Sequence, residues 1–375
     1  MSEIMKRRLP AVLLLGSYLA LSGGVWNGDA AAAPSGRWSV LEMPATTSSP
    51  AAAPFLIAIT RAGDRLVAAG ERGIVFLSDD NGTTWRQAAV PVNVTLTAVR
   101  FASPRRGWAI GHFGVVLRTD DGGETWTKQL DGMSVAAAFL KDAREKTGAD
   151  GASEAVRAAE RLVQDGPDKP FLDLLVFDER RALVLGAYGL AMRTEDGGTS
   201  WTPASAAIDN QGHWHLNAGA ATPNGQDIYI VGEQGSLFRS QNGGATFEAL
   251  TSPYEGSLFA ALATSSDDVI IVGLRGNAFR SSDRGMSWTK VELAGAATMT
   301  SAIRLRDGTA LLADQAGQIY RRTGGGSQFQ RVEAPVHVPV SGLVEAANGA
   351  VLAVGPAGVQ PILSAPSTVL PPRAQ

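Results

Sequence analysis

The sequence predicts an all-β fold: a seven-bladed β-propeller with a small helical insertion between blades 2 and 3. Six segments share a strand, the pattern Gly-x-x-Gly (Asp-x-x-Gly in the sixth), a second strand and a polar turn closed by an aromatic residue. Several of the closing aromatics are 41 residues apart. Each period has room for four short strands, which is the content of a propeller blade.

The composition agrees with a large packed core and excludes several kinds of function. Hydrophobic residues make up 45% of the 375 residues, so the chain is not disordered. The absence of cysteine excludes a disulfide framework, a cysteine-type zinc site and thiolate catalysis. A net charge of -3 gives no electrostatic footprint for nucleic acid.

Residues 1–32 have the features of a secretory signal peptide. Lys6, Arg7 and Arg8 precede an apolar stretch from Leu9 to about Trp26, and small residues follow at 30–33. We expect cleavage near Ala31 or Ala32 and therefore an exported, periplasmic protein, with membrane association as a further possibility. The alternative is an uncleaved membrane anchor, although glycine and serine residues dilute the apolar stretch.

The repeats follow one another in order along the rest of the chain. Their closing aromatics are Trp85, Trp126, Trp201, Phe247, Trp288 and Phe329. Apolar runs upstream of each, such as Leu96–Phe101 and Arg65–Gly70, predict an inner and a second strand. These strands read as nearly continuous apolar runs because both faces of a blade pack on neighbouring blades.

The spacing of 75 residues between Trp126 and Trp201 is 41 plus 34, so this gap carries an insertion, which lies at about residues 134–168. It reads as two short helices, about Ala136 to Lys146 and Ser153 to Gln164. Each has an apolar stripe. The stripes either pack against each other and the blade, or they form a knob on which a partner docks.

The seventh repeat is incomplete at the C-terminal end of the chain. Val351–Gly355 and Gly358 repeat the strand and the glycine turn, but no closing aromatic follows. Trp38, in the segment of about 37–43, resembles the missing aromatic and outer strand. We therefore expect a propeller of residues 33–375 in which this N-terminal strand closes the last blade.

The polar turns share the pattern Ser/Thr-x-Asp-x-Gly-x-x-Trp, which resembles the Asp-box of sialidases and other propellers. The acidic or amide positions are Asp80, Asp121, Asp196, Asn242 and Asp283, and the tryptophans of the closing position are Trp85, Trp126, Trp201 and Trp288. A short carboxylate can accept N–H groups of its own turn, and glycine permits positive φ. Because a catalytic acid is needed only once, the recurrence favours a structural role over catalysis or metal binding.

An arginine recurs just before the polar turn in five repeats. These residues are Arg118, Arg193, Arg239, Arg280 and Arg321. They either form a basic ring for an acidic partner or pair with turn carboxylates between blades, and we favour the second interpretation.

The unit from Leu96 to Trp126 contains Arg-Gly-Trp-Ala-x-Gly-x-x-Gly and Arg-Thr-x-Asp-Gly-Gly-x-x-Trp. With the other repeats it resembles the photosystem II assembly/stability factor family of BNR/Asp-box β-propellers. The resemblance covers about Arg37 to Leu363. The segment from Gly166 to Asp173 resembles the non-photosynthetic bacterial branch. The lack of a lipoprotein cysteine and the helical insertion depart from the photosynthetic members.

This resemblance implies an exported, non-enzymatic scaffold that assists the assembly, stability or activity of a membrane protein complex. In a photosynthetic host that complex would be photosystem II, and in another host it would be a membrane protein such as a transporter. The resemblance implies a membrane-protein partner and no cofactor. We expect a monomer that binds no nucleic acid and no metal.

Propeller geometry assigns the Gly-x-x-Gly turns and the insertion to one face and the polar turns to the other. Aromatic and charged residues of the first face are candidates for partner binding. The candidates are Arg72, His112, Phe113, Lys169, Tyr188, Glu233, Tyr254, Glu255 and Arg275. The alternative is that these turn tips are simply polar and exposed.

Two further alternatives remain from the sequence. The Asp-boxes suggest a sialidase-like glycan hydrolase or a glycan-binding propeller, but the chain has no early Arg-Ile-Pro segment and few tyrosines. A metal-dependent enzyme would use His112, His213 and His215, of which the last two would share one strand face.

Overall fold

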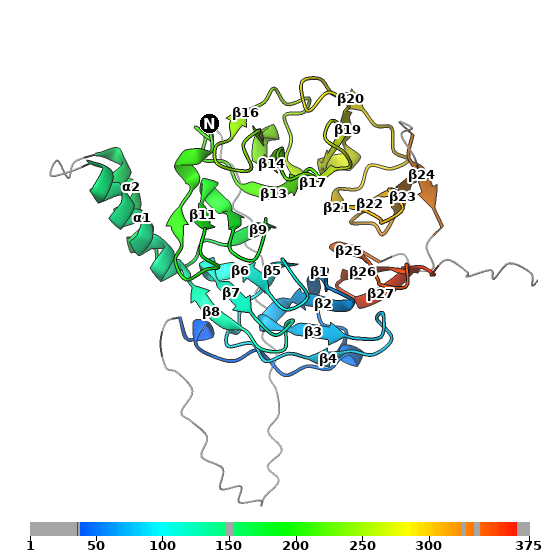
Figure 1. Cartoon of the computed structure of the whole chain (residues 1–375), viewed down its shortest axis with the longest axis horizontal. Coiled ribbons are helices and arrows are strands. Elements are labelled where there is room, and N and C mark those ends of the chain that lie inside the picture. The colour runs from blue at the N-terminus through cyan, green and yellow to red at the C-terminus, as the bar shows by residue number, and fades with distance from the viewer. Residues whose placement is uncertain (1–35, 37, 148–152, 324–327, 334–337, 366–375) are drawn as a thin grey trace, which may run out of the picture. The chain divides into compact units, whose positions relative to one another are not determined.

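The computed structural model describes residues 36, 38–147, 153–323, 328–333 and 338–365. The chain divides into a unit of Met1–Ser35, outside the described residues, and a unit of Gly36–Gln375. Figure 1 shows that the second unit is a ring of seven antiparallel sheets. The predicted seven-bladed propeller is therefore confirmed. The expected signal peptide of 1–32 lies outside the described residues.

Each blade is built from strands in sequence order, with the inner strand first. Blade 1 contains β1 (Leu56–Ala62), β2 (Arg65–Gly70), β3 (Val75–Ser78) and β4 (Arg86–Gln87). Blade 2 contains β5 (Leu96–Phe101), β6 (Gly107–Gly111), β7 (Val116–Thr119) and β8 (Thr127–Leu130). Blade 3 contains β9 (Phe171–Val176), β10 (Ala182–Gly186), β11 (Ala191–Thr194) and β12 (Thr202–Pro203).

The later blades repeat this order. Blade 4 contains β13 (Leu216–Ala221), β14 (Ile228–Gly232), β15 (Leu237–Ser240) and β16 (Glu248–Ala249). Blade 5 contains β17 (Leu258–Ala263), β18 (Val269–Gly273), β19 (Ala278–Ser281) and β20 (Thr289–Lys290). Blade 6 contains β21 (Met299–Arg304), β22 (Ala310–Asp314), β23 (Ile319–Arg322) and β24 (Gln330–Val332). Blade 7 contains β25 (Gly342–Glu345), β26 (Val351–Gly355) and β27 (Gly358–Leu363).

The core lies between the blades. The second strand of a blade is buried along its whole length, as in β14 and β18, because each of its faces packs on a neighbouring blade. One apolar cluster joins Leu183 of blade 3 to Ile230 of blade 4, and another joins Tyr229 of blade 4 to Ile271 of blade 5. Removal of this surface from water provides the main driving force for assembling the ring.

The ring closes between blades 7 and 1 by side-chain packing. Leu352 and Val354 of β26 share an apolar cluster with Ile59 of β1 and Phe76 of β3. The N–H of Asn348 also donates to the side-chain oxygen of Asn81 at 3.0 Å. Among the described residues the last sheet has three strands.

The expectation that residues 37–43 supply a strand to blade 7 was therefore wrong. Residues Ser39–Leu41 form a short 3-10 helix, η1, on the side of blades 1 and 2. Leu41 is buried against valines of the segment between β4 and β5, and the N–H of Asn93 donates to the carbonyl of Val40 at 2.8 Å. Tertiary packing on this apolar segment replaces the strand pairing that the isolated Trp38 indicated.

The predicted insertion between blades 2 and 3 is confirmed as two helices, α1 (Gly132–Thr147) and α2 (Glu154–Asp165). Ala143 of α1 and Val156 and Ala159 of α2 are buried against one another. Val135 of α1 joins the apolar cluster of blades 2 and 3. The apolar stripes therefore pack against each other and the blade, as the first of the two interpretations has it. Within the described residues, no helix is both long and apolar enough to span a membrane.

The polar turns use their acidic residue to hold the turn together. Asp80 accepts the N–H of Thr84 at 2.8 Å, the Thr84 hydroxyl at 2.6 Å and the Ser78 hydroxyl at 2.8 Å. Ser78 in turn accepts the N–H of Gly82 at 2.8 Å. Equivalent bonds recur at Asp121, Asp196 and Asp283 and, through its amide oxygen, at Asn242. Each carboxylate is thus engaged within its own turn.

The recurring arginines also act within the ring. Arg118 donates to the carbonyl of Gly197 in the next blade at 2.6 Å, and Arg193 donates to the carbonyl of Gly244. Arg239 and Arg280 instead pair with carboxylates of their own blades, Asp227 and Asp268. Arg118 and Arg193 thus connect blades through carbonyl groups, whereas Arg118 also pairs with Asp120 and Arg321 with Asp307, each in its own blade. The expected pairing with turn carboxylates of a neighbouring blade was therefore wrong for these arginines.

Acid should weaken the propeller through these turns. The hydroxyl and N–H of Thr84, with the Ser78 hydroxyl, lower the pKa of Asp80 to about 2, and the pKa values of Asp196 and Asp283 fall to about 2 in the same way. The folded state therefore binds these protons only at lower pH than the unfolded state does. Their stabilisation is present above pH of about 4 and is lost as the pH falls toward about 2.

We expect the melting temperature to fall between pH 4 and pH 2 less steeply when Asp80, Asp196 and Asp283 are all replaced by Asn. Asparagine is a fitting replacement because Asn242 of the fourth turn accepts the same N–H and serine hydroxyl bonds and donates to the Thr246 hydroxyl. Calorimetric scans of both proteins over this range measure the difference. Equal slopes would contradict the assignment of these carboxylates.

Candidate partner-binding face

The Gly-x-x-Gly turns define one face of the propeller, here called the glycine-turn face. In the turns of blades 1 to 5 the residue before the second glycine has a left-handed backbone. These residues are Arg72 (φ 53°), Phe113 (φ 59°), Tyr188 (φ 56°), Gln234 (φ 54°) and Arg275 (φ 57°). Such a conformation is uncommon for bulky residues and often accompanies functional positions.

Close backbone contacts require glycine at several positions of these turns. A Cβ on Gly111 would lie 2.2 Å from the carbonyl oxygen of Thr95, and one on Gly235 would lie 2.0 Å from that of Tyr254. The turn backbone is therefore fixed by the neighbouring chain. The middle residues can vary freely and set the chemistry of the face.

The N-terminal segment covers the part of this face that belongs to blades 1 and 2. The ring of Trp38 lies 5.9 Å from that of Phe113, and the N–H of Thr46 donates to the carbonyl of Arg72 at 3.1 Å. Of the three candidates in these blades, Phe113 is half-buried, whereas Arg72 and His112 have exposed side chains. The N-terminal segment therefore covers Phe113 but leaves the side chains of Arg72 and His112 exposed.

Blades 3 and 4 bring four side chains together on this face. The Lys169 ammonium lies 5.5 Å from the centre of the Tyr188 ring. The edge of that ring meets His215, with ring centres 4.9 Å apart, and His215 Nδ1 lies 3.2 Å from a carboxylate oxygen of Glu233. We call Lys169, Tyr188, His215 and Glu233 the blade 3–4 cluster. It contains three of the predicted candidates.

Neighbouring carboxylates stabilise the positive charge of Lys169. Partial burial lowers the pKa of Lys169, but hydrogen bonds to Asp168 and Asp165 outweigh this effect and raise the pKa above its usual value. The bond to Asp165 spans 3.2 Å and connects the cluster to the end of α2. A continuous set of contacts thus runs from the helical hairpin across blade 3 to blade 4.

The remaining candidates lie around the next turns. Tyr254 packs on Phe279 with ring centres 6.0 Å apart and is half-buried. Glu255 and Arg275 have exposed side chains. Within the described part of the chain, the guanidinium of Arg275 and the carboxylate of Glu255 form no ion pair, so they are available to a ligand.

Sequence reasoning placed His215 in a metal site and overlooked its contact with Tyr188. The two histidines do not share a strand face, because β13 begins at Leu216 and His213 has a left-handed backbone (φ 50°). In the residues that the structure describes, no three His, Asp or Glu side chains are grouped as a metal site would require. The aromatic contact could not have been found from spacing, since it joins two blades.

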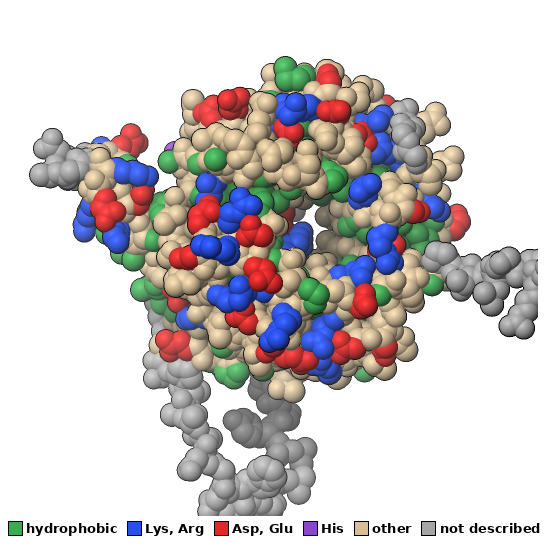
Figure 2. Space-filling model, in the orientation of Figure 1, with side chains coloured by type: hydrophobic (Ala, Val, Ile, Leu, Met, Phe, Trp, Pro, Cys, Tyr) green, Lys and Arg blue, Asp and Glu red, His purple; other side chains and the backbone are tan. Residues whose placement is uncertain are grey.

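The opposite side, here called the Asp-box face, is crossed by ion pairs. Arg65 and Arg86 of blade 1 both reach Glu124 of blade 2, and Arg284 of blade 5 reaches Asp227 of blade 4 at 2.8 Å. On the face seen in Figure 2, Lys/Arg and Asp/Glu side chains lie next to one another around the hollow centre of the ring. Ion pairs between blades thus use several charges of the Asp-box face.

One protein family, described as Photosynthesis system II assembly factor YCF48, matches residues 77–141 and 154–321, which is more than half of the chain. The chain belongs to this family. The matched residues of the YCF48 family run from β3 to β23 and thus include most of the ring. A comparison with curated proteins finds no match.

Solved structures share the fold. A YCF48 structure with a bound D1 peptide has a TM-score of 0.60 and 14% identity, covering 86% of this chain and 99% of that one. YCF48 from Cyanidioschyzon merolae has a TM-score of 0.61 and 14% identity, covering 85% and 98%. The WD40 β-propeller domain of Doa1 has a TM-score of 0.59 and 9% identity, covering 88% and 97%.

Proposed function

We propose that this chain is an exported, non-enzymatic scaffold that binds a segment of a membrane protein on its glycine-turn face and assists the assembly or stability of that protein. Membership of the YCF48 family supports an assembly role. A related YCF48 propeller binds a peptide of D1, which is a membrane protein. The N-terminal sequence supports export to the periplasm, with or without membrane association.

We choose the glycine-turn face because most of the large exposed apolar side chains lie on it. The large apolar residues that the structure leaves exposed are Phe55 (41%), Met133 (54%), Val163 (44%), Tyr188 (58%), Trp214 (40%) and Met286 (73%). All but Met286 lie on the glycine-turn face or on the hairpin inserted there. Exposed apolar and aromatic groups gathered on one side are typical of protein-binding surfaces.

The blade 3–4 cluster is the centre of the surface that we propose. Trp214 directly precedes His215 of the cluster, and Val163 lies on α2, whose last residue pairs with Lys169. Aromatic rings flanked by a lysine and a glutamate combine apolar contact with orienting charges. A peptide segment, which carries both apolar and charged groups, matches this combination better than a partner with a flat, purely apolar surface would.

The client that we propose is a membrane protein other than photosystem II, such as a transporter. The sequence supports this choice, because it lacks the lipoprotein cysteine of cyanobacterial members and carries the α1–α2 hairpin. The Asp-boxes, which suggested a glycan hydrolase, hold their own turns together, and the chain has no early Arg-Ile-Pro segment. We therefore favour the scaffold over the glycan-directed alternative.

The test is a crosslinked pull-down of the tagged protein from native membranes, read by mass spectrometry. We expect one integral membrane protein to be recovered, and its yield to fall about tenfold or more for the double variant Tyr188→Asn and Trp214→Ala. Asparagine is chosen because it tolerates the left-handed backbone of position 188.

Met286→Ala is the matched control, because it removes an exposed apolar side chain from the Asp-box face. Its yield should equal that of the wild type. Loss of the partner with Met286→Ala alone would place binding on the other face. Recovery of soluble proteins only would refute the membrane-protein client.

A further inference from the structure

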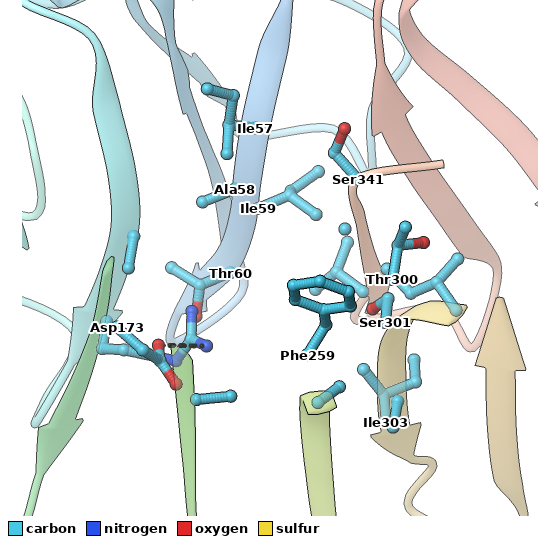
Figure 3. Close-up of a pocket in the computed structure, with 18 of the residues that line it drawn as sticks. Ile57, Ala58, Ile59, Thr60, Asp173, Phe259, Thr300, Ser301, Ile303 and Ser341 are labelled. Carbon is cyan, nitrogen blue, oxygen red and sulfur yellow. Dashed lines mark hydrogen bonds and ion pairs between the residues drawn. The ribbon is translucent and has the colours of Figure 1, made fainter. Parts of the chain in front are cut away.

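The inner strands of all seven blades line a central cavity of about 600 Å³ (Figure 3). This volume is in the range that holds a small organic ligand. The cavity is separate from the blade 3–4 cluster, since none of the four cluster residues lines it. What it could bind follows from how its lining changes along the axis of the ring.

Each inner strand starts at the glycine-turn face and ends at the Asp-box face, so position along the strand gives depth in the cavity. Near the starts of their strands, Ile57, Leu172 and Phe259 present apolar side chains, and Phe259 projects into the open space in Figure 3. The same level carries uncharged polar residues, Thr97, Asn217 and Thr300, whose side chains donate to backbone carbonyls. Toward the strand ends the lining becomes charged. The charged residues there are Arg61, Arg100, Arg304, Arg306 and Glu345.

Charges in the cavity are unbalanced. The four arginines face two carboxylates, Glu345 and Asp173. Arg306 lies 3.2 Å from Glu345, and Arg100 lies 3.3 Å from Asp173. Those two pairs use both carboxylates of the lining.

The other two arginines have no partner among the lining carboxylates. Arg61 pairs with Asp64, whose side chain is 91% exposed to solvent, and donates to the carbonyl of Gly63 at 2.8 Å. Within the part of the chain that the structure describes, the Arg304 side chain makes no ion pair and no hydrogen bond, so its charge is the surplus one. Surplus positive charge at one end of a concave site favours an anion, which a guanidinium binds through charge-assisted hydrogen bonds.

We propose that the central cavity binds a small organic acid, with its carboxylate among the arginines at the Asp-box end and its apolar body against Phe259 and Leu172. The order of groups in the ligand matches the order of groups along the cavity. The acid enters from the Asp-box face, the side opposite the proposed partner surface. This inference therefore does not depend on the proposed function.

The test is isothermal titration of the full protein with decanoate, which carries one carboxylate and an apolar chain. We expect saturable binding at one site with a Kd of the order of 100 µM. Decanol lacks the charge and inorganic phosphate lacks the apolar body, so both should bind at least about tenfold more weakly. Added salt should weaken decanoate binding, because the arginines lie near the mouth.

Two variants locate the site. Arg304→Gln removes an exposed charge and should raise the Kd for decanoate about tenfold without affecting folding. Phe259→Ala should weaken decanoate binding and leave the weaker phosphate binding unchanged. Arg275→Gln is the matched control, because it removes an exposed arginine from the glycine-turn face.

Decanoate binding that is weakened by Arg304→Gln and Phe259→Ala but not by Arg275→Gln would establish the site. The proposal is overturned by any of three results. These are the absence of saturable binding up to about 5 mM, equal affinity for decanol, or an affinity that neither cavity variant changes.

Discussion

Asp227→Ala is expected to destabilise the propeller by about 3 to 5 kcal/mol, because it leaves a buried guanidinium without its carboxylate. The side chains of Asp227 and Arg239 are only 3% and 6% exposed. Arg239 donates to Asp227 at 2.9 and 2.7 Å, and Arg284 of the next blade donates to it at 3.0 and 2.8 Å. One carboxylate therefore neutralises an arginine within blade 4 and connects blade 4 to blade 5.

Urea unfolding measures the change through the free energy of unfolding. Asp64→Ala is the matched control, because Asp64 pairs with Arg61 at 3.1 Å but is 91% exposed, so its loss should cost less than about 1 kcal/mol. Equal losses for the two variants would show that Arg239 finds water or another acceptor. Replacing Asp227 by Leu and Arg239 by Met together should recover part of the stability, since the pair is then removed whole.

Gly235→Ala is expected to destabilise the protein by about 3 kcal/mol, through backbone strain and a steric clash. Gly235 has a positive φ of 70°, and a Cβ would lie 2.0 Å from the carbonyl oxygen of Tyr254. That oxygen belongs to the segment between blades 4 and 5, so it cannot move without shifting Tyr254 from Phe279. The same variant should therefore disturb the aromatic contact that borders the proposed partner surface.

Gly225→Ala separates the two contributions. Gly225 has nearly the same φ of 69°, but nothing lies within 4 Å of an added Cβ. Its replacement should cost about 1 kcal/mol, which is the conformational term alone. A thermal melt of both variants gives the difference. If Gly225→Ala is as damaging as Gly235→Ala, the close approach to Tyr254 is not what requires glycine in the turn.

The repeat allowed the ring to be predicted, but the closure prediction failed for a physical reason. The sequence has one aromatic, Trp38, that matches the missing position of blade 7, and strand pairing was the natural inference. Packing decided otherwise: Leu41 is buried among the valines that lead from β4 to β5, and Trp38 contacts Phe113. A single motif residue cannot reveal which of two apolar surfaces buries more of the segment.

The candidate face was predictable because turn position follows from the repeat, but the groupings on it were not. The order of strands places Tyr188 and Glu233 on the same side. Only the contact of Tyr188 with His215, which joins blade 3 to blade 4, makes them one cluster. The central arginines were overlooked for the same reason, since Arg61 and Arg304 are 243 residues apart in the sequence.

The number of blades, the place of the helical insertion and the chemistry of each turn follow from the repeat pattern. These features are local, because a 41-residue period, a Gly-x-x-Gly turn or an Asp-box is complete within one repeat. How the ring closes, where the N-terminal segment lies and which side chains meet became known from the folded structure. Those outcomes depend on burial and distance between blades, and a one-dimensional pattern contains neither.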